Sequence, residues 1–181
     1  MKSSVAIIIL VLSIFSCKSP EARKPILKKS GSFLKESADR NIELNQAEGE
    51  RILEILSILP DSSYQSSESG FWYRYINKVE QDTIQPEFGD LVEYNMSIRN
   101  LDSSLIYSEK EMGSRRYVMD KEELFTGLRE GLKLMKPEET VIFYFPSQKA
   151  YGYYGDERRI GTNQPIICEV TLNSIFKNET D

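Results

Sequence analysis

Residues 127–155 read GLREGLKLMKPEETVIFYFPSQKAYGYYG, and this stretch decides the fold. Leu128, Leu132 and Met135 recur at helical spacing, so they predict the apolar face of a short helix. Pro137 lacks a backbone N–H and its ring clashes with the preceding turn, so the helix has to end before it. The stretch therefore starts with a short helix whose apolar face is buried.

The second half of the stretch predicts a strand followed by an aromatic loop. Thr140–Phe145 (TVIFYF) is β-branched and aromatic, as a half-buried strand prefers. Pro146 opens a loop that contains Ala150-Tyr151-Gly152. An apolar segment near the end of the chain, Pro165–Leu172 (PIICEVTL), is the expected partner of the first strand.

Upstream segments predict further strands. Leu91–Ile98 alternates apolar and polar residues with period two, which indicates a strand with one solvated face. The other expected strands are Phe71–Val79, Leu105–Tyr107 and Arg115–Met119, and Glu109–Gly113 is expected to be a loop. Strands outnumber helices and no βαβα alternation appears. We therefore predict an α+β fold, with an antiparallel sheet of about five or six strands wrapped on one short helix.

The N-terminus predicts export and a lipid anchor. Val5–Phe15 is an apolar run that is too short to span a bilayer, which needs ~20 residues, so residues 1–16 are typical of a signal peptide. Residues 14–17 (IFSC) resemble the lipobox of bacterial lipoproteins, in which the cysteine thiol is acylated, although Phe15 departs from the usual small residue. We predict lipidation at Cys17. The alternatives are an ordinary cleaved signal and an uncleaved anchor.

Between this anchor and the main domain, which is expected over residues 70–176, the chain predicts a tether and a helix. Residues 17–45 are assigned to the lipidated cysteine and a flexible tether, and residues 46–62 to an N-terminal helical segment. The helix itself is expected from Gln46 to Ile58, with Pro60 behind its end. Its apolar stripe either docks on the domain or forms a dimer seam, and consists of Ile52, Leu53, Leu56 and Leu59.

The composition excludes several classes of function. The net charge is −5 and no basic tract occurs, so nucleic acid is not an expected partner. The chain has no His, the commonest general base and metal ligand, and no phosphate-binding or nucleophile-elbow motif. We therefore expect no metal and no cofactor. A disulfide between Cys17 and Cys168 is the alternative to lipidation of Cys17.

Motifs between Phe71 and Phe176 resemble those of the FKBP-type peptidyl-prolyl isomerases, in the family's order and near its spacing. They are Gly89-Asp90 before the strand that carries Tyr94, the FTGL motif at 125–128, the PSQKAYG motif at 146–152, and Ile160 ahead of the last strand. Each piece alone is weak, but the combination is specific. The resemblance implies the FKBP-like fold and activity on X-Pro bonds, in clients that are exported proteins.

The resemblance also implies roles for individual residues. Tyr94, Phe125 and Tyr151 would be the catalytic groups, with Tyr151 donating from the loop and the Phe125 N–H binding a neighbouring carbonyl. The walls of the proline pocket would be Ile106, Tyr107, Tyr117, Leu124, Leu128, Phe143, Ile160 and Cys168. No cofactor is implied. From composition and periodicity alone, these side chains would be read simply as core.

Four positions depart from the family pattern. Tyr107 stands where the family has its pocket aspartate, and Arg115 where an aromatic residue opens the third core strand. Cys168 replaces an aromatic residue of the last strand, and Gly161 replaces a proline after the loop. The changes at Tyr107 and Cys168 favour a second hypothesis, a binding module or chaperone of the same fold that has weak or no catalysis. The retained Tyr94, Phe125 and Tyr151 favour the enzyme.

A closer resemblance is to lipoproteins of this family that are associated with gliding motility in Bacteroidetes. The Phe71-Trp72-Tyr73 strand and the Ile106-Tyr107-Ser108 variant carry it. It implies a protein anchored by lipid in the cell envelope, facing the periplasm, that assists the folding of exported envelope or motility proteins. A third reading is a structural lipoprotein that dimerises through its N-terminal helix.

Overall fold

The computed structural model describes residues 30–59, 64–80 and 84–178. The predicted signal peptide, Cys17 and Pro60 lie outside the described residues. Within the described part of the chain, no helix is both long enough and apolar enough to cross a membrane.

Helix α2 (Ser30–Ile58) is longer than the sequence predicted. It begins at Ser30 rather than near Gln46, so the expectation of a flexible tether was wrong for residues 30–45. The physical reason is that these residues include several good helix formers, namely Lys, Glu, Ala, Arg and Leu, and no proline. The chain divides into two units, residues 1–37 and 38–181, and α2 contributes its first turns to one and the rest to the other.

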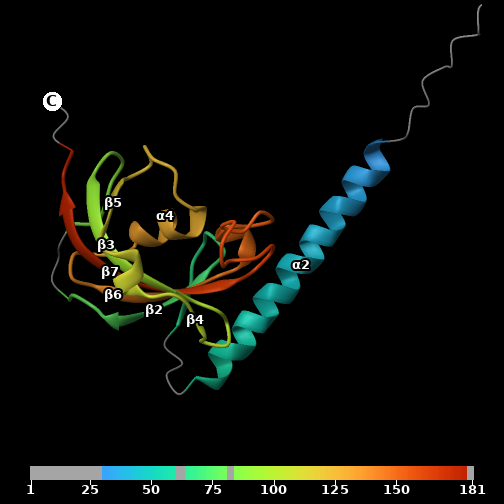
Figure 1. Cartoon of the computed structure of the whole chain (residues 1–181), viewed down its shortest axis with the longest axis horizontal. Helices are drawn as coiled ribbons and strands as arrows, with labels where there is room; N and C mark the ends of the chain where they lie inside the picture. The colour runs from blue at the N-terminus through green and yellow to red at the C-terminus, as the bar shows by residue number, and fades with distance from the viewer. Residues whose placement is uncertain (1–29, 60–63, 81–83, 179–181) are drawn as a thin grey trace, which may run out of the picture. The chain divides into compact units, whose positions relative to one another are not determined.

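Seven strands in the second unit form one antiparallel sheet, in the order β1-β2-β6-β7-β3-β4, with β5 paired to β3 (Figure 1). Their bounds are β1 (Gln65–Ser66), β2 (Trp72–Asn77), β3 (Leu91–Arg99), β4 (Leu105–Tyr107), β5 (Arg115–Val118), β6 (Thr140–Phe145) and β7 (Ile166–Phe176). The predicted α+β fold and the antiparallel pairing of β6 with β7 are confirmed. The sheet exceeds the predicted strand number because the two-residue strand β1 was not predicted.

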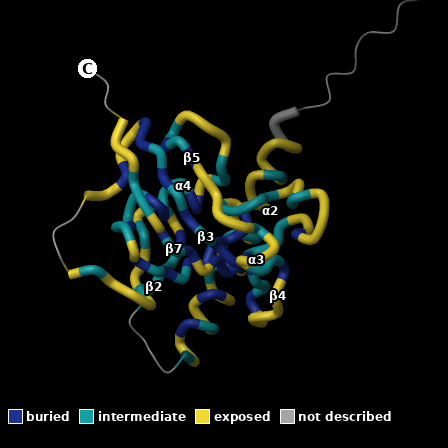
Figure 2. Tube along the Cα trace, turned by 60° about the vertical axis from the view of Figure 1, so that its left-hand side comes forward, coloured by how far each residue is buried: buried dark blue, intermediate teal, exposed yellow. Residues whose placement is uncertain are grey.

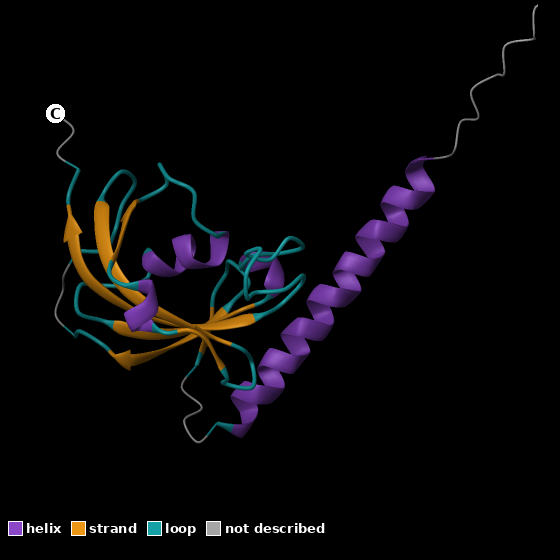
Figure 3. Cartoon of the chain, in the orientation of Figure 1, coloured by secondary structure: helices purple, strands orange, loops and turns teal. Residues whose placement is uncertain are grey.

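Short helices connect the strands: α3 (Glu109–Met112), α4 (Thr126–Leu132) and the 3-10 helix η2 (Ser147–Lys149) (Figure 3). Helix α3 corrects the prediction of a loop after β4. Its one turn is stabilised because the Ser108 side chain accepts a hydrogen bond from the Glu111 N–H at 3.2 Å. Glu109 and Glu111 also lie in the first turn, where the helix dipole is positive and favours carboxylates.

Helix α4 covers one face of the sheet. Leu128 and Leu132 are fully buried there, as is Met135, which lies just beyond the end of the helix. The helix approaches β6 closely because Gly127 and Gly131 face large aromatic rings of that strand. A Cβ on Gly127 would lie 2.5 Å from Cδ1 of Phe145, so no side chain fits between helix and strand.

The opposite face of the sheet is covered by the part of α2 that belongs to the second unit. Ile52 and Leu56 pack with Leu101, Tyr144 and Ile167 in a second apolar cluster. The apolar stripe of α2 therefore docks on the domain, which was one of the two predicted alternatives. Figure 2 shows the resulting pattern, with buried positions along the strands and exposed positions on many of the connecting loops.

Replacing Gly127 by alanine should destabilise the domain. The new Cβ would also lie 2.6 Å from the Lys149 carbonyl oxygen, so backbone has to move, and overpacking of this kind typically costs about 1–3 kcal/mol. The matched control is Gly49→Ala in α2, whose Cβ would lie 3.4 Å from Trp72, an ordinary contact. Because alanine is the better helix former by about 0.5–1 kcal/mol, this control should stabilise the protein. Urea unfolding measures both, and equal effects of the two variants would contradict the packing argument.

Candidate functional site

Three adjoining hollows open in one region of the surface, and Tyr151, in the loop after β6, lines two of them. The first, of ≈ 550 Å³, includes Tyr107, Arg115 and Tyr151 in its wall, and the second, of ≈ 520 Å³, includes Phe125 and Tyr151. The third, of ≈ 410 Å³, is lined by Tyr94 and Arg115 among others. Shared lining residues join the three into one aromatic and polar surface at the N-terminal end of α4.

Phe125 connects helix α4 to this surface. It is the N-cap residue of α4, with an extended backbone (φ −61°, ψ 141°), and its ring lies 5.1 Å from that of Tyr151 and 5.5 Å from that of Phe145. Within the described residues its N–H has no hydrogen-bond partner. The site therefore offers a backbone donor on a residue whose ring contacts two other aromatic rings.

Two tyrosine hydroxyls are also available. Neither Tyr94 nor Tyr151 makes a hydrogen bond through its hydroxyl within the part of the chain that the structure describes. Burial raises the pKa of Tyr94 to about 12 and also raises the pKa of Tyr151. Both phenols consequently stay protonated at neutral pH and can donate to a bound ligand.

The carboxylate of Asp156 lines the first hollow, although no motif predicted it there. Asp156, in the same loop as Tyr151, accepts a hydrogen bond from the Tyr107 hydroxyl and three from the backbone N–H groups of Arg158 (3.0 Å), Arg159 (2.9 Å) and Ile160 (2.7 Å). Burial acts to raise the pKa of Asp156, but these hydrogen bonds outweigh it and lower the pKa. The position where the family has its pocket aspartate thus carries a tyrosine bound to an aspartate of the loop.

Arg159 fastens this loop to α3 and β4. Its guanidinium donates to both carboxylate oxygens of Glu111, at 2.9 and 2.6 Å, and to the Ile106 carbonyl at 2.8 Å. It also lies over the Tyr107 ring, 4.8 Å from the centroid. The outer wall of the first hollow is therefore built by a connected set of polar contacts.

The structure divides the predicted site residues between two layers. Those that line the three hollows are Tyr94, Tyr107, Tyr117, Leu124, Phe125 and Tyr151. Those that lie in the core cluster and line none of the three are Ile106, Leu128, Phe143, Ile160 and Cys168. The roles assigned to both groups stay predictions.

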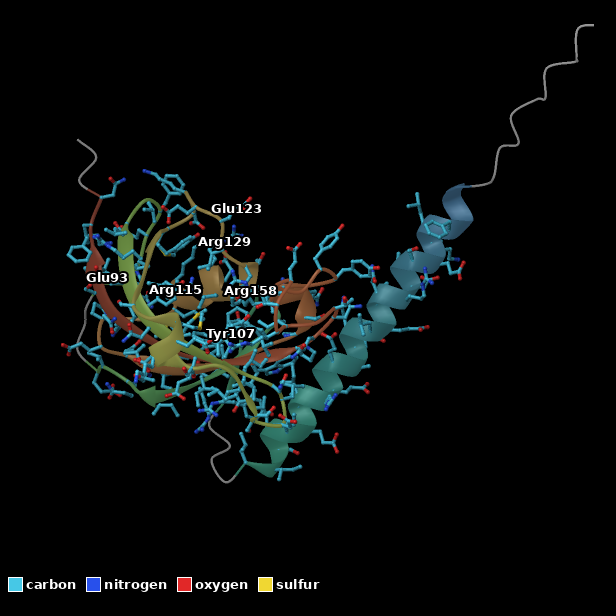
Figure 4. The ribbon with its side chains drawn as sticks, in the orientation of Figure 1. Glu93, Tyr107, Arg115, Glu123, Arg129 and Arg158 are labelled. Carbon is cyan, nitrogen blue, oxygen red and sulfur yellow. The ribbon has the colours of Figure 1, made fainter. Side chains whose placement is uncertain are left out.

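Sequence reasoning missed several residues of this surface. Asp156, Glu111 and Arg158 line the first hollow, yet none belongs to a motif that was recognised. The only signal was their position, since Asp156 and Arg158 follow the Tyr-Gly loop directly. Figure 4 shows Tyr107, Arg115 and Arg158 gathered near α4. Among residues 30–59, 64–80 and 84–178, no three His, Cys, Asp or Glu side chains come together in a way that suits a metal ion.

Helix α2 is connected to the site loop by a buried hydrogen-bonded pair. The Glu48 carboxylate accepts from the Ser147 N–H at 2.7 Å and from the Ser147 hydroxyl at 2.8 Å. The Ser147 carbonyl in turn accepts from the N–H groups of Ala150 (3.0 Å) and Gly152 (2.8 Å), on either side of Tyr151. The helix thereby helps to set the backbone that presents Tyr151.

Truncating Glu48 to alanine should destabilise the domain by about 1–3 kcal/mol, because Ser147 is then left with two buried donors unpaired. Ser147→Ala should cost a similar amount, and the double variant less than the sum of the two. The control is Asn45→Ala, which removes an exposed bond to Gln148 between the same two elements and should change stability by less than about 0.5 kcal/mol. Additive effects of Glu48 and Ser147 in chemical denaturation would contradict the coupling.

The fold and the site together define a class of protein. An antiparallel sheet wrapped on one short helix carries an aromatic surface with neutral hydroxyl and N–H donors, which suits a peptide ligand better than hydrolytic chemistry. The chain belongs to the family of FKBP-type peptidyl-prolyl cis-trans isomerases, whose model matches residues 82–173. This match confirms the predicted family and lies inside the predicted domain 70–176, whose outer bounds stay a prediction.

Similar proteins are known in bacteria. The probable FKBP-type peptidyl-prolyl cis-trans isomerase FkpA of Neisseria meningitidis serogroup B (strain ATCC BAA-335 / MC58) is 24% identical over 158 residues, which cover 87% of this chain and 56% of that protein. The chain thus spans about half the length of this relative.

Solved structures share the fold. A peptidyl-prolyl cis-trans isomerase from Pseudomonas syringae pv. tomato matches with a TM-score of 0.60 and 18% identity, over 75% of this chain and 95% of that chain. FkpA from Escherichia coli matches with a TM-score of 0.59 and 22% identity, over 96% of this chain and 82% of that chain.

Proposed function

We propose that this protein accelerates the cis–trans isomerisation of X-Pro bonds in exported proteins. The observation that carries the proposal is that two donors without a partner among the described residues, the Tyr151 hydroxyl and the Phe125 N–H, belong to residues whose rings lie 5.1 Å apart. A peptide segment laid across this contact can accept from both donors. Membership of the isomerase family supports the same conclusion.

The chemistry follows from the electronic structure of the amide. Resonance across the X-Pro bond sets a barrier near ~20 kcal/mol, and rotation needs neither a nucleophile nor a net proton transfer. In the twisted amide conjugation is lost and charge separation decreases, so an aromatic, partly dry surface stabilises it relative to water. Tyr94 would form the aromatic wall at the proline, while Tyr151 and the Phe125 N–H orient the neighbouring carbonyl groups.

Removing one donor tests this directly. Tyr151→Phe keeps the ring contact with Phe125 and removes only the hydroxyl, so kcat/KM for a short X-Pro peptide should fall about tenfold, as expected for one lost hydrogen bond in the transition state. The matched control is Tyr153→Phe, because Tyr153 lies in the same loop with its side chain exposed and lines none of the three hollows.

The measurement is the relaxation of the peptide from cis to trans with purified protein. A rate for Tyr151→Phe equal to that of the wild type, with both above the spontaneous rate, would place the catalytic donor elsewhere. A well-folded wild-type protein without any acceleration would rule out catalysis on that peptide.

A catalytically weak binding module is the second candidate. The observation that favours it is the exposed Arg115, which lines the first and third hollows at a position where the family has an aromatic residue. In this case the protein would hold extended or Pro-containing segments of an envelope partner. Binding of X-Pro peptides without acceleration would select this candidate over the first.

We further propose that the protein is anchored to a membrane by lipid on Cys17 and faces the periplasm. Residues 1–16 have the basic start and apolar run of a signal peptide, and the cysteine follows at once. An acyl chain on Cys17 would tether the domain without a membrane-spanning helix. Within this setting, the sequence resemblance to gliding-motility lipoproteins favours envelope or motility proteins as clients.

Lipidation can be tested in bacterial cells that are fed a labelled fatty acid. The wild-type chain should carry the label and sediment with membranes, whereas Cys17→Ser should lose the label and leave the membrane fraction. Cys168→Ser is the control, because Cys168 is fully buried in the core and should not be acylated. Label retained in Cys17→Ser would contradict the proposed anchor.

A further inference from the structure

Two arginines of the first hollow lack ionic partners. Arg115, at the start of β5, and Arg158, in the loop after β6, are exposed and form no ion pair or side-chain hydrogen bond within the described residues. Other arginines near the site are already paired. Arg159 binds Glu111. The Nε of Arg129 lies 3.5 Å from Oδ1 of Asp120 and 3.4 Å from Oε1 of Glu130.

Both unpaired guanidinium groups line the hollow that also contains Tyr151. They reach it from two different elements, β5 and the loop after β6 (Figure 4). A guanidinium offers a planar fork of N–H donors that matches a carboxylate, and it stays charged at every physiological pH. The site therefore holds two unused carboxylate-binding groups beside its candidate catalytic tyrosine.

The acidic groups of the same hollow do not bind these two guanidinium groups. Glu111 is bound by Arg159, and Asp156 already accepts four hydrogen bonds. Glu157 is the one acidic side chain of this hollow that has no partner within the described residues. Asp156 keeps its negative charge because its four donors are neutral, so the two arginines offer an acidic ligand their unused N–H donors rather than a net positive charge.

We propose that Arg115 and Arg158 select X-Pro segments that carry an acidic side chain next to the proline. This inference rests on the proposed function, since it names the substrate class of the same site. The aromatic residue that the family has at position 115 would contribute only apolar contact. A guanidinium there replaces that contact by attraction to Asp or Glu and by repulsion of Lys or Arg.

The test compares three peptides that differ only in the residue before proline, which is Glu, Gln or Lys. The full chain, purified in mild detergent, should give the order Glu, Gln, Lys in kcat/KM, with roughly tenfold between the first and last at low salt. Because both arginines are exposed, the ratio should shrink towards one at about 0.5 M salt. Equal rates for the three peptides would overturn the selectivity while leaving the isomerase function standing.

Variants assign the selectivity to these residues. Arg115→Gln and Arg158→Gln should each lower the ratio of the Glu to the Gln peptide, and Arg115→Glu should invert the preference towards the Lys peptide. Glu157→Gln should raise the ratio, because it removes the opposing charge. The control for net charge is Arg51→Gln, an exposed arginine on α2 that lines none of the three hollows, and it should leave the ratio unchanged.

Failure of the proposed function gives a different result. If none of the three peptides is accelerated, the selectivity is measured as Kd for the same peptides and variants. Tighter binding of the Glu peptide that is lost in Arg115→Gln would uphold the inference without catalysis. A preference that persists in both arginine variants, in either measurement, would overturn it.

Discussion

The close approach of α4 to β6 is the constraint on which the site depends. Gly127 and Gly131 leave room for the rings of Phe145 and Phe143, so the helix lies directly on the strand. This contact fixes the N-terminal end of the helix and with it the Phe125 backbone. The exposed donor of the site is thus a product of core packing, because a longer separation of helix and sheet would move it away from Tyr151.

The loop that carries Tyr151 is held at two points. At its beginning, Ser147 donates hydrogen bonds to Glu48 of α2. Further along, Asp156 accepts hydrogen bonds from three backbone N–H groups and from the Tyr107 hydroxyl. Gly155 allows the turn between these points, with φ of +68° and its Cα so near the Ile160 carbonyl that no side chain fits. The loop is thus held by polar contacts to α2 and to the end of β4, as well as by hydrogen bonds within itself.

The elements that could be predicted are those whose residues follow a local pattern of spacing or composition. Alternation in Leu91–Ile98 and β-branched residues in Thr140–Phe145 correctly indicated β3 and β6, and helical spacing indicated α4. Contacts between residues far apart in sequence leave no such period, which is why the Glu48–Ser147 pair was not foreseen. The contribution of Asp156 could not be predicted for the same reason, because its bond to Tyr107 joins a loop to the end of β4, and these two segments meet only in the finished fold. Helix α2 was underestimated since helix formers without an apolar stripe resemble a polar tether.

The central claim is that a proline binds between Tyr94, Phe125 and Tyr151 and isomerises there. NMR of an isotope-labelled X-Pro peptide with a small amount of protein measures both parts, through cis–trans exchange cross-peaks and through intermolecular NOEs from the proline ring. We expect protein-dependent exchange together with NOEs to the rings of Tyr94 and Phe125. Exchange without these contacts, or contacts confined to another surface, would contradict it.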